Sequence, residues 1–160
     1  MKDSKNSTAH DFWKRLDDVT AGMLKTGPED FAPMAPHGDE EEKAIWFITA
    51  KGTAAHQAAI EGMSTHFAIC DQSAKLHAVV KGKLQEVSDP KKVDELWSRV
   101  TGAWFEGGRD DPDVRLIRLT PSQAEVWLTD GGASFFYEIA RANIQEEHTP
   151  DVGTHEVVNF

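Results

Sequence analysis

Short runs of β-branched, aromatic and aliphatic residues recur along the chain, and most of them end at a turn of hairpin length. Runs of this composition and length are typical of β-strands. Seven are expected, at residues 19–26, 31–36, 44–49, 65–72, 76–87, 114–120 and 124–129. Parallel neighbours would need a crossover helix at almost every step, and the chain has too few helical segments for that. The spacing therefore predicts a mainly β, antiparallel sheet with peripheral helices, and closure into a small barrel would remove its exposed edges.

The turns indicate how these strands connect. Residues 73–75 separate two long strands as a hairpin, and Pro121-Ser122 would turn a final hairpin. Residues 37–43, with the sequence HGDEEEK, are expected to form the charged tip of another hairpin. Gly82 falls inside the strand at residues 76–87, where a glycine marks a bulge or a bend.

Helices are expected at four places. Ser7 or Thr8 is suited to cap a short helix whose apolar face holds Phe12, Trp13 and Leu16. A second helix begins near Thr53. The other two are expected at residues 90–100, with a proline in the first turn, and at residues 133–144.

The length of 160 residues predicts one domain, spanning residues 1–160. Within it, residues 1–9 are expected to be loose and residues 145–160 to form an irregular arm. With 27 acidic and 17 basic side chains the formal charge is −10, which disfavours nucleic-acid binding. No apolar run reaches the ~20 residues that span a bilayer and no secretion signal is recognisable, so a cytoplasmic location without membrane contact is expected.

No set of residues in the sequence has the pattern of a catalytic or metal site. The chain lacks the GxSxG, GxGxxG and GxxxxGK[ST] motifs, and its histidines lack HxH, HxxxH and HExxH spacing. The single cysteine, Cys70, excludes an internal disulfide and a cysteine zinc site. We therefore expect no catalytic side chain and no bound metal.

One local pattern does indicate a ligand. The expected strand at residues 44–49 leads through Lys51 and Gly52 into a helix opened by Thr53. Free N–H groups at the start of a helix attract a phosphate or carboxylate, and Lys51 and His56 would reinforce that attraction. The alternative is an ordinary capped helix whose N–H groups face water, and the pattern taken alone favours this alternative.

The order of motifs along the chain carries a resemblance to a known family. GMLKT, APMAP, IWFITAKGT, VVKGKLQEVSDPKKVDELW, AWFEGGRDDPD, VRLIRLTPSQAEVWL and PDVG follow one another over residues 11–158. In this order they resemble the bacterial general stress proteins of the pyridoxamine phosphate oxidase-like group, the FMN-binding split barrels. The resemblance implies a six- to seven-stranded Greek-key split barrel that forms a homodimer. It also implies a flavin, FMN or FAD, in a groove at the dimer interface.

The resemblance also implies which residues would contact the flavin. The strand Trp46-Phe47-Ile48-Thr49 would line the isoalloxazine ring, and Pro33 and Met34 would meet the ribityl or phosphate end. Thr53 would contact the phosphate, His77 would meet the ring edge, and Trp104 would form an aromatic wall. Lys51 is expected near the phosphate because of its place at the helix start, not because of the resemblance.

Two positions depart from the family pattern. An arginine usually precedes the Pro-Met pair and a lysine usually follows two residues after the hydroxyl, but here the residues are Ala32 and Ala55. A charge-assisted hydrogen bond is worth roughly 1.5–3 kcal/mol, so this change weakens the grip on a phosphate.

Three functions stay open. The first is a flavin-binding stress protein, acting as a low-turnover oxidoreductase with an unknown redox partner. The second is a non-enzymatic dimeric module that binds a different ligand or a protein. The third, a true pyridoxamine phosphate oxidase, ranks last because the arm at residues 145–160 has no arginine or lysine for an anionic substrate.

Overall fold

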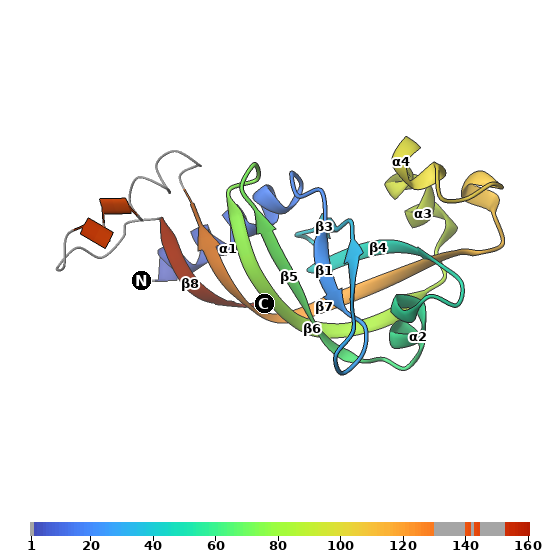
Figure 1. Ribbon diagram of the computed structural model, residues 1–160, viewed down its shortest axis with the longest axis horizontal. Coiled ribbons are helices and arrows are strands. Elements are labelled where there is room, and N and C mark those ends of the chain that lie inside the picture. Colours follow the sequence, from blue (N-terminus) through green and yellow to red (C-terminus); the bar gives the residue numbers. More distant parts are fainter. Residues whose placement is uncertain (1, 130–139, 142, 145–152) are drawn as a thin grey trace.

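The computed structural model describes residues 2–129, 140, 141, 143, 144 and 153–160. Its strands form one curled antiparallel sheet (Figure 1). The strands are β1 (Gly22–Lys25), β2 (Phe31–Met34), β3 (His37–Asp39), β4 (Ala44–Ala50), β5 (Ser64–Asp71), β6 (Leu76–Val87), β7 (Val114–Leu128) and β8 (Thr154–Asn159). They lie in the order β2-β1-β5-β6-β7-β4-β3, and β8 pairs with β7 beside this path. Within the described residues no ladder joins β2 to β3, so the sheet is a split barrel. The expected fold class is confirmed, with eight strands where six or seven were expected.

β7 is one continuous strand, so the hairpin expected at Pro121-Ser122 is wrong. Gly82 pairs with Pro121 and Lys81 pairs with Gln123, which leaves Ser122 as the extra residue of a bulge. A bulge accommodates a proline inside a sheet because the ladder is already interrupted there. The irregularity expected at Gly82 is therefore present, and it bends the sheet without ending the strand.

The end of the chain is more regular than expected. Residues 154–159, part of the expected irregular arm, form β8 and pair with β7 from Gln123 to Leu128. The valines of this segment alternate, with Val158 buried and Val157 exposed, as in a strand with one covered face. Likewise β3 begins at His37, so only the four residues 40–43 form the charged turn.

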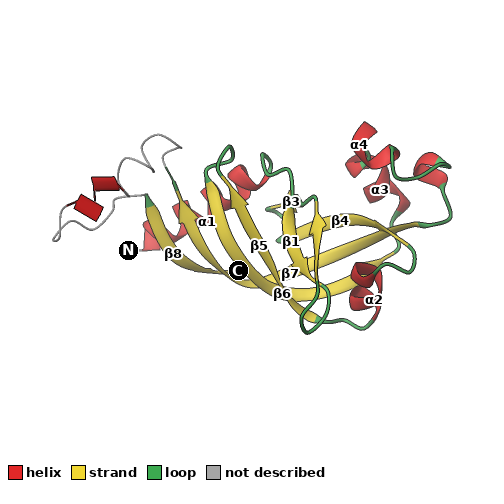
Figure 2. Cartoon of the chain, viewed as in Figure 1, coloured by secondary structure: helices red, strands yellow, loops and turns green. Residues whose placement is uncertain are grey.

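Helices lie around the sheet (Figure 2). They are α1 (Lys2–Leu16), α2 (Ala54–Ile60), α3 (Pro90–Leu96) and α4 (Arg99–Gly102), and a short 3-10 helix covers Gly108–Asp110. α1 begins at Lys2, so residues 2–9 are helical and neither Ser7 nor Thr8 is its cap. The two helical pairs, 140–141 and 143–144, belong to the helix expected at residues 133–144, and the rest of that segment lies outside the described residues.

The helix expected at residues 90–100 is in fact two helices. Asp89 caps α3 by accepting a hydrogen bond from the Lys92 backbone N–H at 3.1 Å. Trp97 then adopts an extended backbone, and the Ser98 hydroxyl accepts from the Thr101 N–H at 3.2 Å. Ser98 thus acts as the start signal of a new helix, α4.

The main core fills the concave side of the sheet. Phe47 and Phe67 meet edge to face at 5.0 Å between ring centroids, and α1 adds Phe12 and Leu16 to the same cluster. A second, smaller cluster holds Ala44, Trp46 and Leu116 on the opposite side of β4, against α3. β4 is therefore covered on both faces, which is why its sequence is a continuous apolar run.

Candidate functional site

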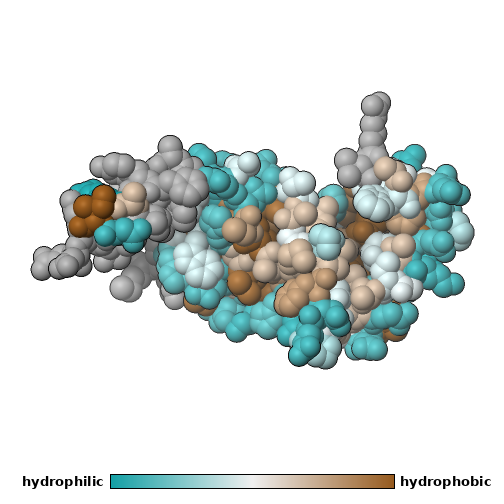
Figure 3. All heavy atoms as spheres, viewed as in Figure 1, coloured by the Kyte–Doolittle hydropathy of each residue, from teal (hydrophilic) through white to brown (hydrophobic). Residues whose placement is uncertain are grey.

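An apolar hollow of about 320 Å³ opens on the outer side of β1, β2, β5 and β6. Two of the expected contact residues, Pro33 and His77, line it. The His77 Nδ1 lies 3.2 Å from the Cys70 Sγ, and Trp127 on β7 is paired in register with His77. Apolar side chains gather over the strands in the middle of this face (Figure 3). The hollow thus offers a flat apolar wall with one polar ring at its edge.

Thr49 lies near the end of β4, and Lys51 and Thr53 lie in the turn that leads from it to α2. The Thr53 hydroxyl donates to the Ala50 carbonyl at 3.0 Å, accepts from the His56 N–H at 3.2 Å and lies 2.8 Å from the Thr49 hydroxyl. Thr53 is therefore the cap of α2, as expected. Lys51 is exposed, and within the described part of the chain its ammonium has no ion-pair partner.

His56 is turned away from any ligand at this turn. The ring is 5% exposed, and its Nδ1 accepts a hydrogen bond from the Gly52 N–H at 3.0 Å. Its Nε2 lies 3.1 Å from the Glu86 carboxylate, which also faces the Arg115 guanidinium at 3.7 Å. The imidazole thus ties the turn to β6 and does not point outward as a free cation.

The central residues of β4 divide between its two faces. The Phe47 ring is fully buried in the main core, whereas Ile48 is half-buried beside the smaller cluster. Trp46 is 4% exposed and lies between the Lys92 ammonium at 5.4 Å and the Arg118 guanidinium at 5.3 Å from its ring. The Trp46 Nε1 and the Arg118 Nε are buried without a hydrogen-bond partner among the described residues.

Burial and neighbouring charges shift the pKa values of two groups near Trp46, Lys92 and His37. Burial tends to lower the pKa of Lys92, but its hydrogen bond to the Glu95 carboxylate and the charges of Glu42, Glu95 and Asp39 outweigh it and raise the pKa. Burial lowers the pKa of His37, the partner of Trp46 in β3. Lys92 thus stays a cation over the indole ring, where it is attracted by the face of the π-system.

The other expected contacts lie elsewhere. Met34 is half-buried against the main core, and Trp104 is 82% exposed after α4. The Asp111 carboxylate organises the Trp104 loop by accepting hydrogen bonds from the Asp113 and Gly107 N–H groups, which lower its pKa. Ala55, where the family pattern has a lysine, is buried in the main core.

The expected residues fall into separate groups in one chain. His77 lies near the start of β6, and Glu86, which contacts His56, lies near its other end. Nine residues of extended chain span roughly 30 Å. The hollow beside His77 and the turn at Thr53 are thus at opposite ends of β6, and a single chain does not bring them into one site.

Sequence reasoning missed several residues that line the hollow, among them Met23, Cys70, Val79 and Trp127. The sequence signal that they share is their place in the alternation of buried and outward-facing residues, because each occupies an outward position of its strand. Outward apolar residues on neighbouring strands form a patch only once the register is known. Among the described residues no group of three or more side chains could hold a metal, and no helix is long and apolar enough to cross a membrane.

The curled sheet with its outer hollow defines a split-barrel protein. The family model described as pyridoxamine 5'-phosphate oxidase like matches residues 7–151, so the chain belongs to the pyridoxamine 5'-phosphate oxidase-like family. Comparison with curated proteins finds no match.

Solved structures agree with this assignment. A structure from Jannaschia sp. CCS1, assigned as a general stress protein 26, is 42% identical with a TM-score of 0.83, over 97% of this chain and 99% of that one. The general stress FMN/FAD binding protein from Xanthomonas citri is 33% identical with a TM-score of 0.68, over 79% of this chain and 92% of that one. The FAD binding protein from Mycobacterium smegmatis, at 20% identity and a TM-score of 0.52, shares the fold.

Proposed function

We propose that the chain binds a flavin, FMN or FAD, in a groove completed by a second copy of itself. The observation that carries the proposal is the separation of the contact residues. The hollow at Pro33 and His77 and the turn at Thr49, Lys51 and Thr53 lie at opposite ends of β6. In a homodimer the hollow of one chain can meet the turn of the other, so that each of two grooves has both parts. The Xanthomonas citri relative is described as an FMN/FAD binding protein, which supports this choice of ligand.

The described residues fit a flavin in two respects. Met23, Val79 and Trp127 give the hollow an apolar wall for a planar ring. His77 places a polar group at the edge of that wall.

The residues expected at the phosphate end of the flavin fit this ligand less well. Lys51 offers a free ammonium, but Thr53 already uses its hydroxyl as a cap and Ala32 and Ala55 supply no charge. We therefore expect weak recognition of the phosphate, most of it through Lys51. Exclusion of water and orientation of the ring would come from the apolar wall.

A bound flavin supplies the redox chemistry, because it accepts and donates electrons without a catalytic side chain of the protein. The chain's own residues would hold the ring, shield it from water and leave one edge open to an electron donor. We propose a low-turnover oxidoreductase in the cytoplasm whose redox partner is a separate molecule. A second candidate, a dimeric module that binds another ligand or a protein without catalysis, is favoured by Ala32 and Ala55.

Calorimetric titration with FMN, FAD and riboflavin separates the two candidates. We expect all three to bind, with FMN tighter than riboflavin. Lys51→Gln should weaken the affinity for FMN by roughly threefold to tenfold and leave the affinity for riboflavin unchanged, because FMN carries a phosphate and riboflavin does not. Lys14→Gln, which removes an exposed lysine from α1, should change neither. If none of the three ligands binds at submillimolar concentration, the flavin proposal fails and the second candidate stands.

A further inference from the structure

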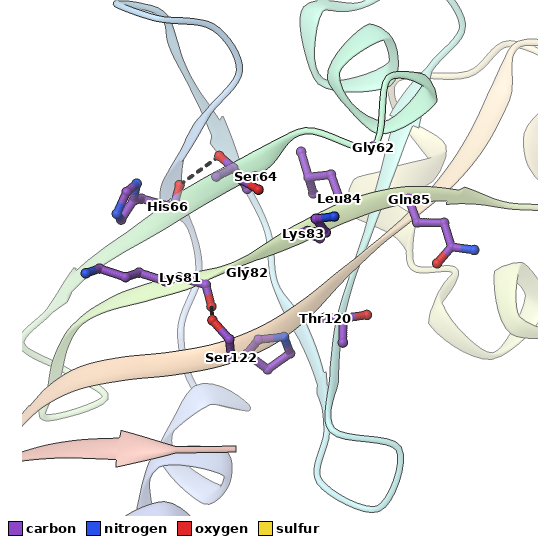
Figure 4. Close-up of a pocket in the computed structure, with 12 residues that line it drawn as sticks. Gly62, Ser64, His66, Lys81, Gly82, Lys83, Leu84, Gln85, Thr120 and Ser122 are labelled. Carbon is purple, nitrogen blue, oxygen red and sulfur yellow. Dashed lines mark hydrogen bonds between the residues drawn. The ribbon is translucent and has the colours of Figure 1, made fainter.

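A second hollow lies apart from both groups of expected flavin contacts. It has a volume of about 820 Å³ and opens over β5, β6 and β7, beside the bulge at Gly82 (Figure 4). A Cβ at Gly82 would lie 2.3 Å from the Thr120 carbonyl oxygen and 2.9 Å from the Pro121 Cα. The absence of that atom lets β6 and β7 approach closely, and the extra residue Ser122 bends the sheet around the hollow.

Three cationic or titratable side chains surround this hollow. His66 on β5 is paired in register with Lys81 on β6, and Lys83 follows on the same face of β6. Lys81 and His66 extend in the same direction from neighbouring strands (Figure 4). Side chains two residues apart on a strand lie roughly 7 Å from each other, so both ammonium groups can reach one bound ion.

The structure places no counter-ion beside these three side chains within the part of the chain that it describes. Within the described residues, none of His66, Lys81 and Lys83 has a carboxylate within ion-pair distance, although the chain carries 27 acidic side chains. Like charges on neighbouring positions of a sheet repel each other. An anion bound between them would remove that repulsion, which gives the hollow a preference for negative charge.

Hydroxyl groups complete the donor set. Ser64 lies opposite Lys83 on one side and Thr120 lies opposite it on the other. Ser122 also lines the hollow, but its hydroxyl donates to the Lys81 carbonyl at 3.3 Å, so Ser64 and Thr120 supply the hydroxyl donors. Ammonium groups act as point charges without the planar fork of arginine, and together with hydroxyl donors they suit a tetrahedral phosphate.

The size of the hollow indicates more than a bare ion. Sites for small organic ligands have volumes of roughly 300–1,000 Å³. The lining also includes Leu84 and Pro121, which can contact an organic group. We propose that this hollow binds a phosphate ester of about nucleotide size, with the phosphate between Lys81, Lys83 and His66 and the organic part against Pro121.

The test uses ADP, pyrophosphate and adenosine as probes on the whole chain. Calorimetry measures affinity, and backbone amide shifts of Lys81, Gly82 and Lys83 locate the binding. We expect ADP and pyrophosphate to bind and shift these amides, and adenosine to bind at least roughly tenfold more weakly than ADP. The double variant Lys81→Gln/Lys83→Gln should lose roughly tenfold or more in ADP affinity.

A matched control removes the same charge elsewhere. Lys14→Gln/Lys91→Gln takes away two exposed lysines on α1 and α3 and should leave ADP affinity unchanged. The single variant His66→Asn, with the fold checked by circular dichroism, gives a second measure should the lysine pair affect folding. Equal losses in both double variants would show a diffuse charge effect and overturn the proposal.

Other outcomes would also overturn the proposal that this hollow binds a phosphate ester. If neither ADP nor pyrophosphate binds at millimolar concentration, or if adenosine binds as well as ADP, there is no phosphate site. Competition between pyrophosphate and FMN would show that the hollow is part of the flavin groove and would overturn a separate site. These readouts need no bound flavin. The phosphate-ester proposal can therefore fail while flavin binding stands, and flavin binding can fail while the phosphate-ester proposal stands.

Discussion

Gly82 is a residue whose identity is set by a close backbone approach. The Thr120 carbonyl oxygen and the Pro121 Cα occupy the space that a side chain would need. Neither atom belongs to a flexible side chain, so relief would require movement of the strand itself.

Replacing Gly82 by alanine should therefore destabilise the fold by about 1–3 kcal/mol, the usual cost of forcing an extra carbon into a packed site. The measurement is the midpoint of urea unfolding with an unchanged m-value. Lys81→Ala, at the exposed neighbouring position, should change stability by less than about 0.5 kcal/mol. Equal stability of Gly82→Ala and the native chain would show that the two strands can separate without cost.

Residue roles were predictable from sequence where the partner is close along the chain. Thr53 caps a helix whose first turn follows at once, so local spacing was enough. The orientation of His56 was not predictable, because it depends on Glu86, thirty positions away on another element. The same holds for the outward apolar residues of the hollow, which become neighbours only through strand register.

At the scale of elements, α1 is held by its packing more than by its own sequence. Phe12 is fully buried, and its ring lies 5.2 Å from Trp13 and 5.7 Å from Phe160, the residue that follows β8. The Phe160 N–H also donates to the Ser122 carbonyl at 3.1 Å. α1 and β8 therefore stabilise each other although they come from opposite ends of the sequence.

Truncation of Phe12 to alanine should cost about 3–5 kcal/mol, because it removes a large side chain from a filled core. Chemical denaturation measures the loss. Lys14→Ala, an exposed change on the same helix, should cost less than about 0.5 kcal/mol. A loss below about 1 kcal/mol for Phe12→Ala would mean that α1 does not contribute its packing to the fold in solution.

The strands and their antiparallel pairing could be predicted because the hydrophobic runs are short and bounded by turns. Errors arose at Pro121-Ser122 and at residues 154–159. Pro-Ser is a strong turn signal, and only the bulge opposite Gly82 shows that the strand passes through it. The strand β8 is short and has only two apolar residues, so pairing with β7 specifies it more than its own composition does.

At the scale of the whole molecule, the edge of the sheet at β1 and β2 leaves large apolar side chains exposed. Phe31 is 52% exposed and Met23 is 43% exposed, and Met23 lines the hollow together with Pro33. Exposed apolar patches of this kind mark interaction surfaces. The proposed homodimer would cover them and close the flavin groove at the same time.

Light scattering after gel filtration should give a mass of twice 17.7 kDa for the native chain. Phe31→Glu should shift it toward the single-chain mass and weaken flavin binding together with association, because burial of a charge in an apolar interface is unfavourable. Ser73→Glu, which adds the same charge at the exposed β5–β6 turn, should leave the mass unchanged. A single-chain mass for the native protein at tens of micromolar would contradict the dimer.

The continuity of β7 has a consequence for how the molecule forms. Its partner β4 ends at Ala50, yet the strand that pairs with it begins only at Val114. Such long-range pairing gives a high contact order and slow folding, on the scale of milliseconds to seconds. During synthesis, β4 and β6 would both present unpaired edges until β7 emerges from the ribosome. This interval is when the nascent chain is most exposed to aggregation and to chaperones.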